Sequence, residues 1–212
     1  MTTSTRALSF GAFSTLLLIA LMMGGNHVAA RVDAAQRRVG RPLVLENATF
    51  YAHMPGCTMS EAEFLRSVCA TADCGMLLDV NNVYVNSLNH RFDPYRFIDQ
   101  MPLERVRQIH LAGHTLVGQT VIDTHIGPIV SAVWTLYRYT IAKAGRLIPT
   151  LIEWDTDVPQ LAVLLDEAAR ARSAAQRAPH TPVATTGPLA TGAAPDRPWQ
   201  NHTAAPSMEL AP

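Results

Sequence analysis

The chain has little cysteine and no excess of charge of either sign. Its 212 residues include only three cysteines, Cys57, Cys69 and Cys74, with no C-x-x-C pair, so neither a disulfide framework nor a cysteine-type zinc site is indicated. Lys and Arg together number 17, as do Asp and Glu. The sequence has no stripe of basic residues interleaved with aromatic residues, so nothing in it indicates nucleic-acid binding. The sequence also lacks Walker, G-x-G-x-x-G, G-x-S-x-G and H-E-x-x-H motifs. These absences argue against nucleotide, serine-hydrolase and zincin chemistry.

Both ends of the chain differ from its middle. Arg6 precedes an apolar stretch from Leu8 to Met23, and Val28-Ala29-Ala30 would serve as a cleavage site, so residues 1–26 resemble a secretory signal. A wrongly placed start codon is the alternative explanation. Residues 173–212 are rich in Ala, Pro and Thr and are expected to be disordered. We expect one domain over 27–172, located in the cytoplasm unless the N-terminal segment directs export.

Four short apolar runs in the middle are typical of buried strands in a parallel sheet. Each ends in a carboxylate or an imidazole, and the runs are Pro42–Asn47, Met76–Asn82, Val106–His114 and Pro149–Asp155. Alternation of strands with helices indicates a parallel α/β fold, and four strands are half of those that close a (β/α)₈ TIM barrel.

Helix signals separate these runs. Predicted helices occupy residues 27–39 before Gly40, residues from the capping box Ser60/Glu63 to Gly75, a segment opened by Asp93-Pro94, residues 128–145, and a last segment opened by Asp157 and Pro159.

Polar side chains repeat at the carboxyl ends of the predicted strands, where the active site of a (β/α) barrel lies. Because side chains alternate along a strand, Leu77, Asp79 and Asn81 are expected to share one face. By the same alternation, four residues point to the barrel mouth: Glu46, Asp79, His110 and Glu153. Asp123 and His125 follow the third strand on a loop and can turn inward beside them.

These residue types predict a metal site. Imidazole mixed with carboxylate suits non-haem iron, manganese or catalytic zinc, and several carboxylates allow more than one ion. Without a cation, acids packed at one mouth would repel, and at least one would have to hold a proton. Nearby amides and a further histidine are expected to orient ligands or substrate; these are Asn47, Asn81, Asn82 and His114.

Seven motifs in this region resemble the signature of the MbnB/TglH-like family, long known as a TIM-barrel domain of unknown function. They are Leu45-Glu46-Asn47, Leu77-Leu-Asp-Val-Asn-Asn-Val-Tyr-Val85, Asn89-His90 with Phe92-Asp93-Pro94, Gln108-Ile-His-Leu-Ala-Gly-His114, Asp123-Thr-His125, Val133-Trp-x-Leu-Tyr137 and Leu151-Ile-Glu-Trp-Asp155. The resemblance covers roughly residues 27–172 and implies that they form the C-terminal half of the barrel.

The resemblance also implies a function. Characterised members hold two or three iron ions and use dioxygen to modify cysteines of a ribosomally made peptide, usually with a small partner protein that presents the peptide. Carried over by position, the implied metal ligands are Glu46, Asp79 or Asn82, His110, Asp123, His125 and Glu153. Asn47, Asn81, His114 and Asp155 are then expected to support the ligands or contact substrate.

The chain departs from the family pattern in two respects. Family members carry four further βα units before this region, and Ile126 stands where an acidic residue is expected. Two other functions therefore stay open: a metal-dependent isomerase or hydrolase of the sugar-isomerase-like barrels, using zinc or manganese, and a non-catalytic fragment. Because half a barrel leaves two sheet edges unpaired, we expect the domain alone to be insoluble or to form a homodimer.

Overall fold

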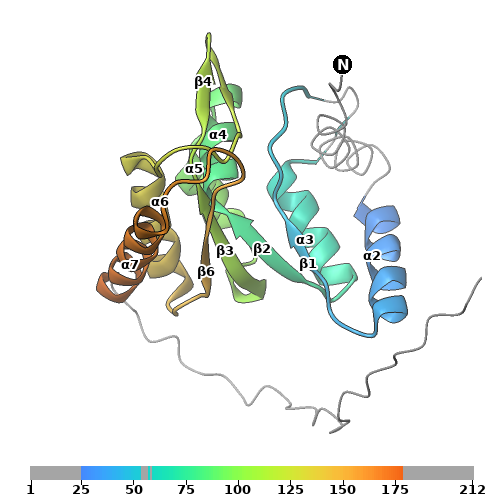
Figure 1. Cartoon of the computed structure of the whole chain (residues 1–212). Helices are drawn as coiled ribbons and strands as arrows, with labels where there is room; N and C mark the ends of the chain where they lie inside the picture. Colours follow the sequence, from blue (N-terminus) through green and yellow to red (C-terminus); the bar gives the residue numbers. More distant parts are fainter. Residues whose placement is uncertain (1–24, 54–56, 58, 179–212) are drawn as a thin grey trace, which may run out of the picture. The chain divides into compact units, whose positions relative to one another are not determined.

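A computed structural model describes residues 25–53, 57 and 59–178. The signal-like stretch up to residue 24 and the predicted disordered tail from residue 179 lie outside the described residues. The elements, shown in Figure 1, are α2 (Gly25–Val39), β1 (Val44–Glu46), α3 (Glu61–Thr71), β2 (Gly75–Asp79), α4 (Val80–His90), α5 (Pro94–Gln100), the 3₁₀ turn η1 (Leu103–Arg105), β3 (Val106–Ala112), β4 (Thr115–Val117), β5 (Thr120–Ile122), α6 (Ser131–Ala144), β6 (Thr150–Glu153) and α7 (Leu161–Arg177).

The four predicted strands form one parallel sheet in the order β1-β2-β3-β6. Pairing aligns their carboxyl ends: Glu46 lies opposite Leu77, Asp79 opposite His110, and Ala112 opposite Glu153. Helices connect successive strands, as parallel pairing requires. The prediction of an α/β fold corresponding to part of a TIM barrel is therefore confirmed.

Most of the predicted helix signals act as expected, but α6 begins at Ser131 and not at Pro128, and α4 was not predicted. The capping box of Ser60 and Glu63 is formed at the start of α3. Asp93 caps α5, with Pro94 at its first position, and α6 ends at Gly145 in a left-handed conformation. The last helix, α7, continues to Arg177, past the predicted domain end at residue 172. Among the described residues, no helix is long and apolar enough to cross a membrane.

One predicted strand ends earlier than expected. The run Met76–Asn82 leaves the sheet at Asp79, whose side chain accepts a hydrogen bond from the Asn82 backbone N–H at 2.7 Å and so caps α4. The expectation that Asn81 shares a strand face with Leu77 and Asp79 is wrong, because residue 81 already lies in the helix. The helix-capping preference of Asp outweighs the apolar pattern at this point.

The hairpin of β4 and β5 was not predicted. Its strands pair in antiparallel fashion around Gly118, which has a φ of +63°. The Asn89 side chain on α4 bonds both backbone groups of Val121, at 2.8 and 2.9 Å. This pair of hydrogen bonds fixes the hairpin to α4, and the hairpin in turn places Asp123 at the end of the sheet.

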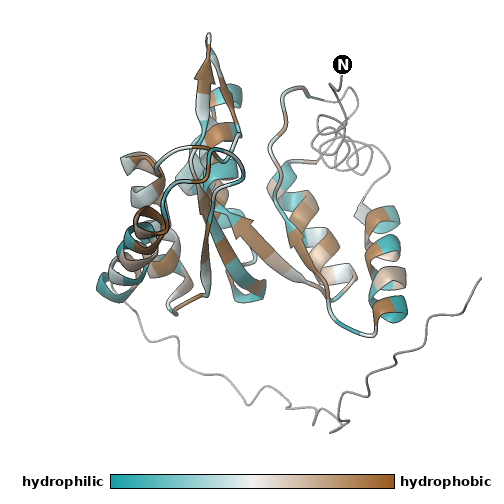
Figure 2. Ribbon diagram, viewed as in Figure 1, coloured by the Kyte–Doolittle hydropathy of each residue, from teal (hydrophilic) through white to brown (hydrophobic). Residues whose placement is uncertain are grey.

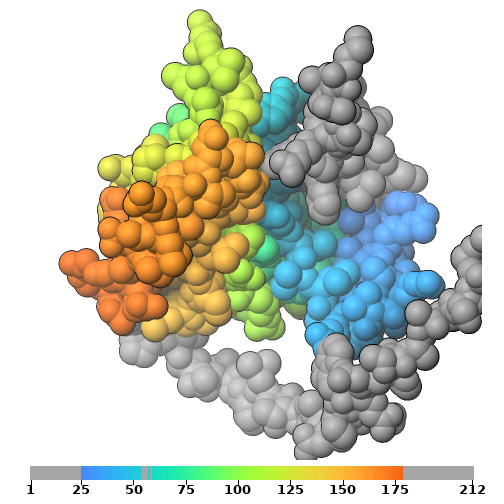
Figure 3. Space-filling model, viewed as in Figure 1, coloured from blue at the N-terminus to red at the C-terminus, as the bar shows by residue number. Residues whose placement is uncertain are grey.

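The two faces of the sheet have different environments. Met76, Leu78, Ile109 and Leu111 point to the helices and are fully buried. Side chains on the other face are much less covered: Val44 is 45% exposed and Leu151 is 44% exposed. Figure 2 shows that the strands are predominantly hydrophobic, and in Figure 3 the segments around β1, in blue, and after β6, in orange, flank the open side.

We expect this open face to drive association of the 212-residue chain. Apolar side chains beside unpaired strand edges favour contact with another chain. Val44→Lys should increase the monomer fraction measured by size-exclusion chromatography with light scattering. Val117→Lys is the matched control, because Val117 is 60% exposed but lies on the hairpin outside the four-stranded sheet. Equal effects of the two substitutions would contradict a role for the open face.

Candidate metal centre

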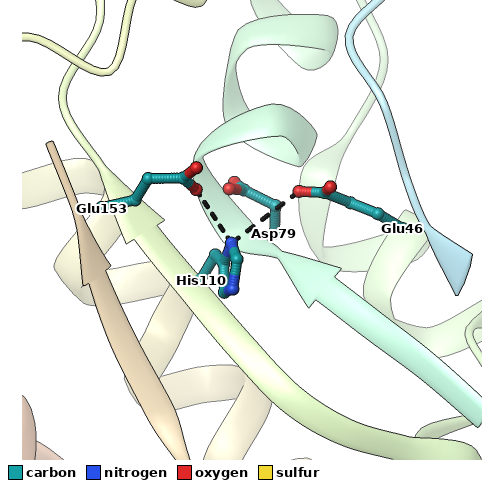
Figure 4. Close-up of side chains that lie close together, drawn as sticks. All are labelled: Glu46, Asp79, His110 and Glu153. Atoms are coloured by element: carbon teal, nitrogen blue, oxygen red, sulfur yellow. Dashed lines mark hydrogen bonds and ion pairs between the residues drawn. The ribbon is translucent and has the colours of Figure 1, made fainter. Parts of the chain in front are cut away.

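Four predicted residues meet at the carboxyl end of the sheet (Figure 4). Glu46 ends β1, Asp79 ends β2, His110 lies near the end of β3, and Glu153 ends β6. Each offers one ligand atom, and these atoms all lie within 4.8 Å of one another. His110 Nδ1 lies 2.8 Å from Glu153 Oε2 and 3.9 Å from Glu46 Oε1. Donors this close can converge on a single cation, and we call these four residues the first ligand group.

A second ligand group lies beside the first and shares Glu153 with it. His125, Glu153 and Asp155 also place their ligand atoms within 4.8 Å of one another. His125 Nδ1 is 3.4 Å from Glu153 Oε1 and 3.4 Å from Asp155 Oδ2. Because the two oxygens of Glu153 face different histidines, this carboxylate can bridge two ions.

The loop that carries His125 crosses the end of β3 at close range. A Cβ atom on Gly113 would lie 2.4 Å from the carbonyl oxygens of both Ile126 and Gly127, so only glycine permits this crossing. His125 itself has a φ of +50°, and its carbonyl accepts a hydrogen bond from the Asp155 backbone N–H at 3.0 Å. These contacts hold the histidine over the strand ends in a conformation that non-glycine residues seldom adopt.

Asp79 is fixed by its neighbours yet keeps one oxygen free. Its backbone N–H and C=O both bond the Asn47 side chain, each at 2.9 Å. Oδ1 serves as the helix cap, whereas Oδ2 is buried and has no hydrogen-bond partner among the described residues. The Asn82 side chain donates to the Asn47 carbonyl at 3.0 Å, and its own Oδ1 is also buried and unpartnered. A buried acceptor without a donor is costly, and a cation would satisfy it.

Asp123 lies behind His125, within a separate polar chain. Its Oδ1 is 2.8 Å from His125 Nε2 and accepts a hydrogen bond from the Asn81 amide, also at 2.8 Å. Asn81 in turn contacts His114 Nδ1 at 2.7 Å. Thr49 donates to the other oxygen of Asp123 at 3.2 Å. Asp123 thus orients His125 in this arrangement.

The predicted ligand set and the observed groups overlap without coinciding. Glu46, Asp79, His110, His125 and Glu153 belong to the two ligand groups of acids and histidines, whereas Asp123 belongs to neither. The amide Asn82 lies beside Asp79 with its Oδ1 buried. Asp155, predicted as a supporting residue, is a member of the second group. The Asp123 contacts of Thr49 and of the Tyr51 hydroxyl were not predicted, because neither residue belongs to a strand end or a motif.

Several carboxylates at this site have displaced pKa values. Burial raises the pKa of Asp79 well above its usual range, and the nearby Asp123 adds to the effect. Burial also raises the pKa of Glu46, although His110 opposes the rise. Bonds from His110 and His125 lower the pKa of Glu153 to about 2. One acid is thus strongly ionised while two others resist ionisation, a conflict that a bound cation would relieve.

Comparisons with known proteins agree with this fold. A parallel half-barrel whose strand ends carry imidazole and carboxylate defines a (β/α)-barrel protein with a candidate metal centre. Residues 21–176 match the family described as RiPP precursor modification enzyme MbnB/TglH/ChrH, and the chain belongs to that family.

Curated relatives carry only the name UPF0276 protein. The relative from Anaeromyxobacter sp. (strain Fw109-5) is 49% identical over 146 residues, which are 69% of this chain and 51% of that protein. The relative from Caulobacter vibrioides is 46% identical over 154 residues, 71% of this chain and 54% of the relative. The one from Rhizorhabdus wittichii is 43% identical over 171 residues, 81% and 61% of the two chains. The chain thus spans about half the length of most of these relatives.

The shared carboxylate predicts how metal content responds to substitution. After anaerobic loading with Fe(II) and desalting, Glu153→Gln should lose metal from both groups, because one carboxylate serves each. Glu46→Gln should weaken only the first group and Asp155→Asn only the second. Elemental analysis measures the ions retained per chain, with Glu104→Gln as the control outside the site. Undiminished metal in Glu153→Gln would contradict the shared-ligand arrangement.

Gly113→Ala tests the position of the loop. The added methyl group must push residues 126 and 127 away from β3, which displaces His125 but leaves the first group in place. We expect affinity at the second group to fall by about 10–100-fold, as when a residue that positions a ligand is lost. Metal titration of the variant and the parent chain measures the change. Gly40→Ala is the control for destabilisation away from the site. Its φ of +70° strains an added methyl group, but no atom lies within 4 Å of a Cβ there, and the residue follows α2, far along the chain from the His125 loop.

Proposed function

We propose that this chain forms the C-terminal half of an iron-dependent enzyme that uses dioxygen to modify cysteines in a ribosomally made peptide. The observation that carries the proposal is the position of Glu153 between His110 and His125, at the centre of two adjacent ligand groups. Membership of a family of peptide-modifying enzymes supports the same reading.

The donor set fits iron. It consists of imidazole nitrogens and carboxylate oxygens without thiolate, the combination that non-haem iron takes in oxygenases. Bound iron would supply the one-electron and dioxygen chemistry that the side chains lack. In the first group, the buried Oδ2 of Asp79 lacks a hydrogen-bond donor among the described residues, and a bound cation would supply the missing interaction.

The surrounding residues hold the ligands in position. Asn47 fixes the backbone of Asp79, so that the free carboxylate oxygen cannot swing away from His110. The Asn81 side chain contacts both His114 and Asp123. Asp123 in turn lies against Nε2 of His125, whereas Glu153 lies near the other ring nitrogen, Nδ1. Both arrangements would keep the ligand side chains oriented around a bound metal.

The substrate we propose is a cysteine-containing peptide, presented by a small partner protein. A cytoplasmic location fits this chemistry, because thiols stay reduced there. The open side of the sheet requires the rest of a barrel to complete the mouth, and the family's greater length supplies enough chain for it.

The decisive test uses a full-length version of the enzyme and a cysteine-containing peptide encoded beside its gene. Anaerobic loading with Fe(II), followed by dioxygen, should change the optical absorption of the iron and the mass of the peptide at its cysteine. Turnover with colourless zinc or manganese, independent of dioxygen, would instead support a metal-dependent isomerase or hydrolase. Reaction by the full-length protein but not by the 212-residue chain under the same conditions would support a non-catalytic fragment.

Loss of the Asn81–His114 pair should reduce activity without removing metal. Neither side chain belongs to a ligand group, but together they position Asp123 and through it His125. In the full-length enzyme, Asn81→Ala and His114→Ala should each lower kcat by about 10–100-fold. Iron analysis of the same samples should give the parent value. Loss of the metal in either variant would make that residue a ligand, contrary to this account.

A further inference from the structure

A separate cavity of about 510 Å³ lies beyond the metal centre. The segment after β1, the start of α3, and the α4–α5 connection with α5 enclose it. Its lining includes Phe50, Phe92 and Phe97 together with Glu61, Asp93 and Arg96. No member of the two ligand groups lines it, so its contents are distinct from the metal site.

Aromatic rings form much of the cavity wall. Phe50 stacks on His90 with the ring centroids 4.0 Å apart, and His53 packs edge-on against both rings. Phe92 and Phe97 form a second stacked pair at 5.5 Å. Faces of aromatic rings attract organic cations electrostatically, in addition to the apolar contact they offer.

Glu61 supplies a carboxylate without a partner inside this aromatic wall. Both of its oxygens are inaccessible to solvent and, among the residues that the structure describes, accept no hydrogen bond. A ligand in the cavity therefore reaches them only by displacing part of the lining that covers them. The residue does not cap α3, because Ser60 and Glu63 perform that role. Burial raises the pKa of Glu61 to about 8. An isolated buried carboxylate is unfavourable, and a ligand with cationic N–H groups would stabilise its ionised form.

The other charges at the cavity leave Glu61 available. The basic residues of the lining are Arg96 and the two histidines His53 and His90. His90 Nε2 is engaged with the Phe50 carbonyl at 2.7 Å, and the Arg96 side chain is 86% exposed and lies 4.0 Å from Asp93. Asp93 contributes a second negative charge at the same opening. The lining thus combines two carboxylates and aromatic faces with one outward-facing guanidinium.

We propose that this cavity binds the cationic side chain of an arginine or lysine from a peptide, with the charged group against Glu61 and its methylene stem against Phe50, Phe92 and Phe97. The proposal stands independently of the reaction at the metal centre. A flexible basic side chain has the required combination of an apolar stem and a terminal N–H donor.

One extended segment separates this cavity from the metal centre. Thr49 and Tyr51 contact Asp123, whereas Phe50 and Ala52 line the cavity. Successive side chains of this segment thus point alternately toward Asp123 and toward the cavity. A peptide anchored in the cavity would therefore be held one chain thickness away from the ligand groups.

Binding of Nα-acetyl-arginine amide to the full chain tests the proposal, with Nα-acetyl-citrulline amide as the neutral probe of the same shape. Calorimetric titration should give a dissociation constant about tenfold or more lower for the arginine probe, as expected for a charge-assisted bond to a buried carboxylate. Glu61→Gln should abolish this preference. Glu63→Gln, on the same helix but outside the cavity, should preserve it.

A second variant separates the aromatic contribution from the charge. Phe92→Leu should weaken both probes, since it removes a ring face without altering Glu61. Thermal unfolding of each variant shows whether it is folded before titration. Equal affinity for arginine and citrulline, absence of binding to the parent chain, or an unchanged preference in folded Glu61→Gln would each overturn the proposal.

Discussion

The parallel register of the sheet is the constraint on which the candidate metal centre depends. Parallel strands end on the same side, so residues far apart in sequence, such as Glu46 and Glu153, approach one another without any local signal linking them. The pairing of Asp79 with His110 then places the buried acid beside the imidazole. A register change of one residue would turn these side chains to the helix-covered face, where apolar packing leaves no room for ions.

Secondary structure and ligand placement are combined at Asp79. One carboxylate oxygen starts α4 and the other faces the ligand group, while the Asn47 amide fixes the backbone from the neighbouring strand. A substitution there would affect both helix initiation and metal binding. Gly113 likewise serves both the backbone path and the site, because the absence of a side chain lets the His125 loop cross the strand end. Much of the site's precision therefore comes from residues that bind no metal.

The two faces of the sheet are covered to different extents. Helices bury one face of the sheet completely, whereas Val44 and Leu151 remain accessible on the other. That exposed face and the ligand groups meet at the same end of the strands. Whatever covers the open face would consequently also shape the mouth at the candidate metal centre.

The sequence by itself determined the four strands, most helix boundaries and the ligand types at the strand ends. These features rest on local physics: apolar periodicity, capping preferences and the alternation of side chains. The early end of β2, the helix α4 that follows it and the β4–β5 hairpin escaped prediction, although Asp79 as a cap and Gly118 as a turn residue are local signals for them. Only the tertiary structure decided that Asp155 joins His125 in a ligand group, that Asp123 lies behind that histidine, and that Glu61 lines a cavity with aromatic residues while its carboxylate oxygens are buried. These outcomes depend on contacts between distant segments, which are set by close packing and do not follow from the spacing of residues along the chain.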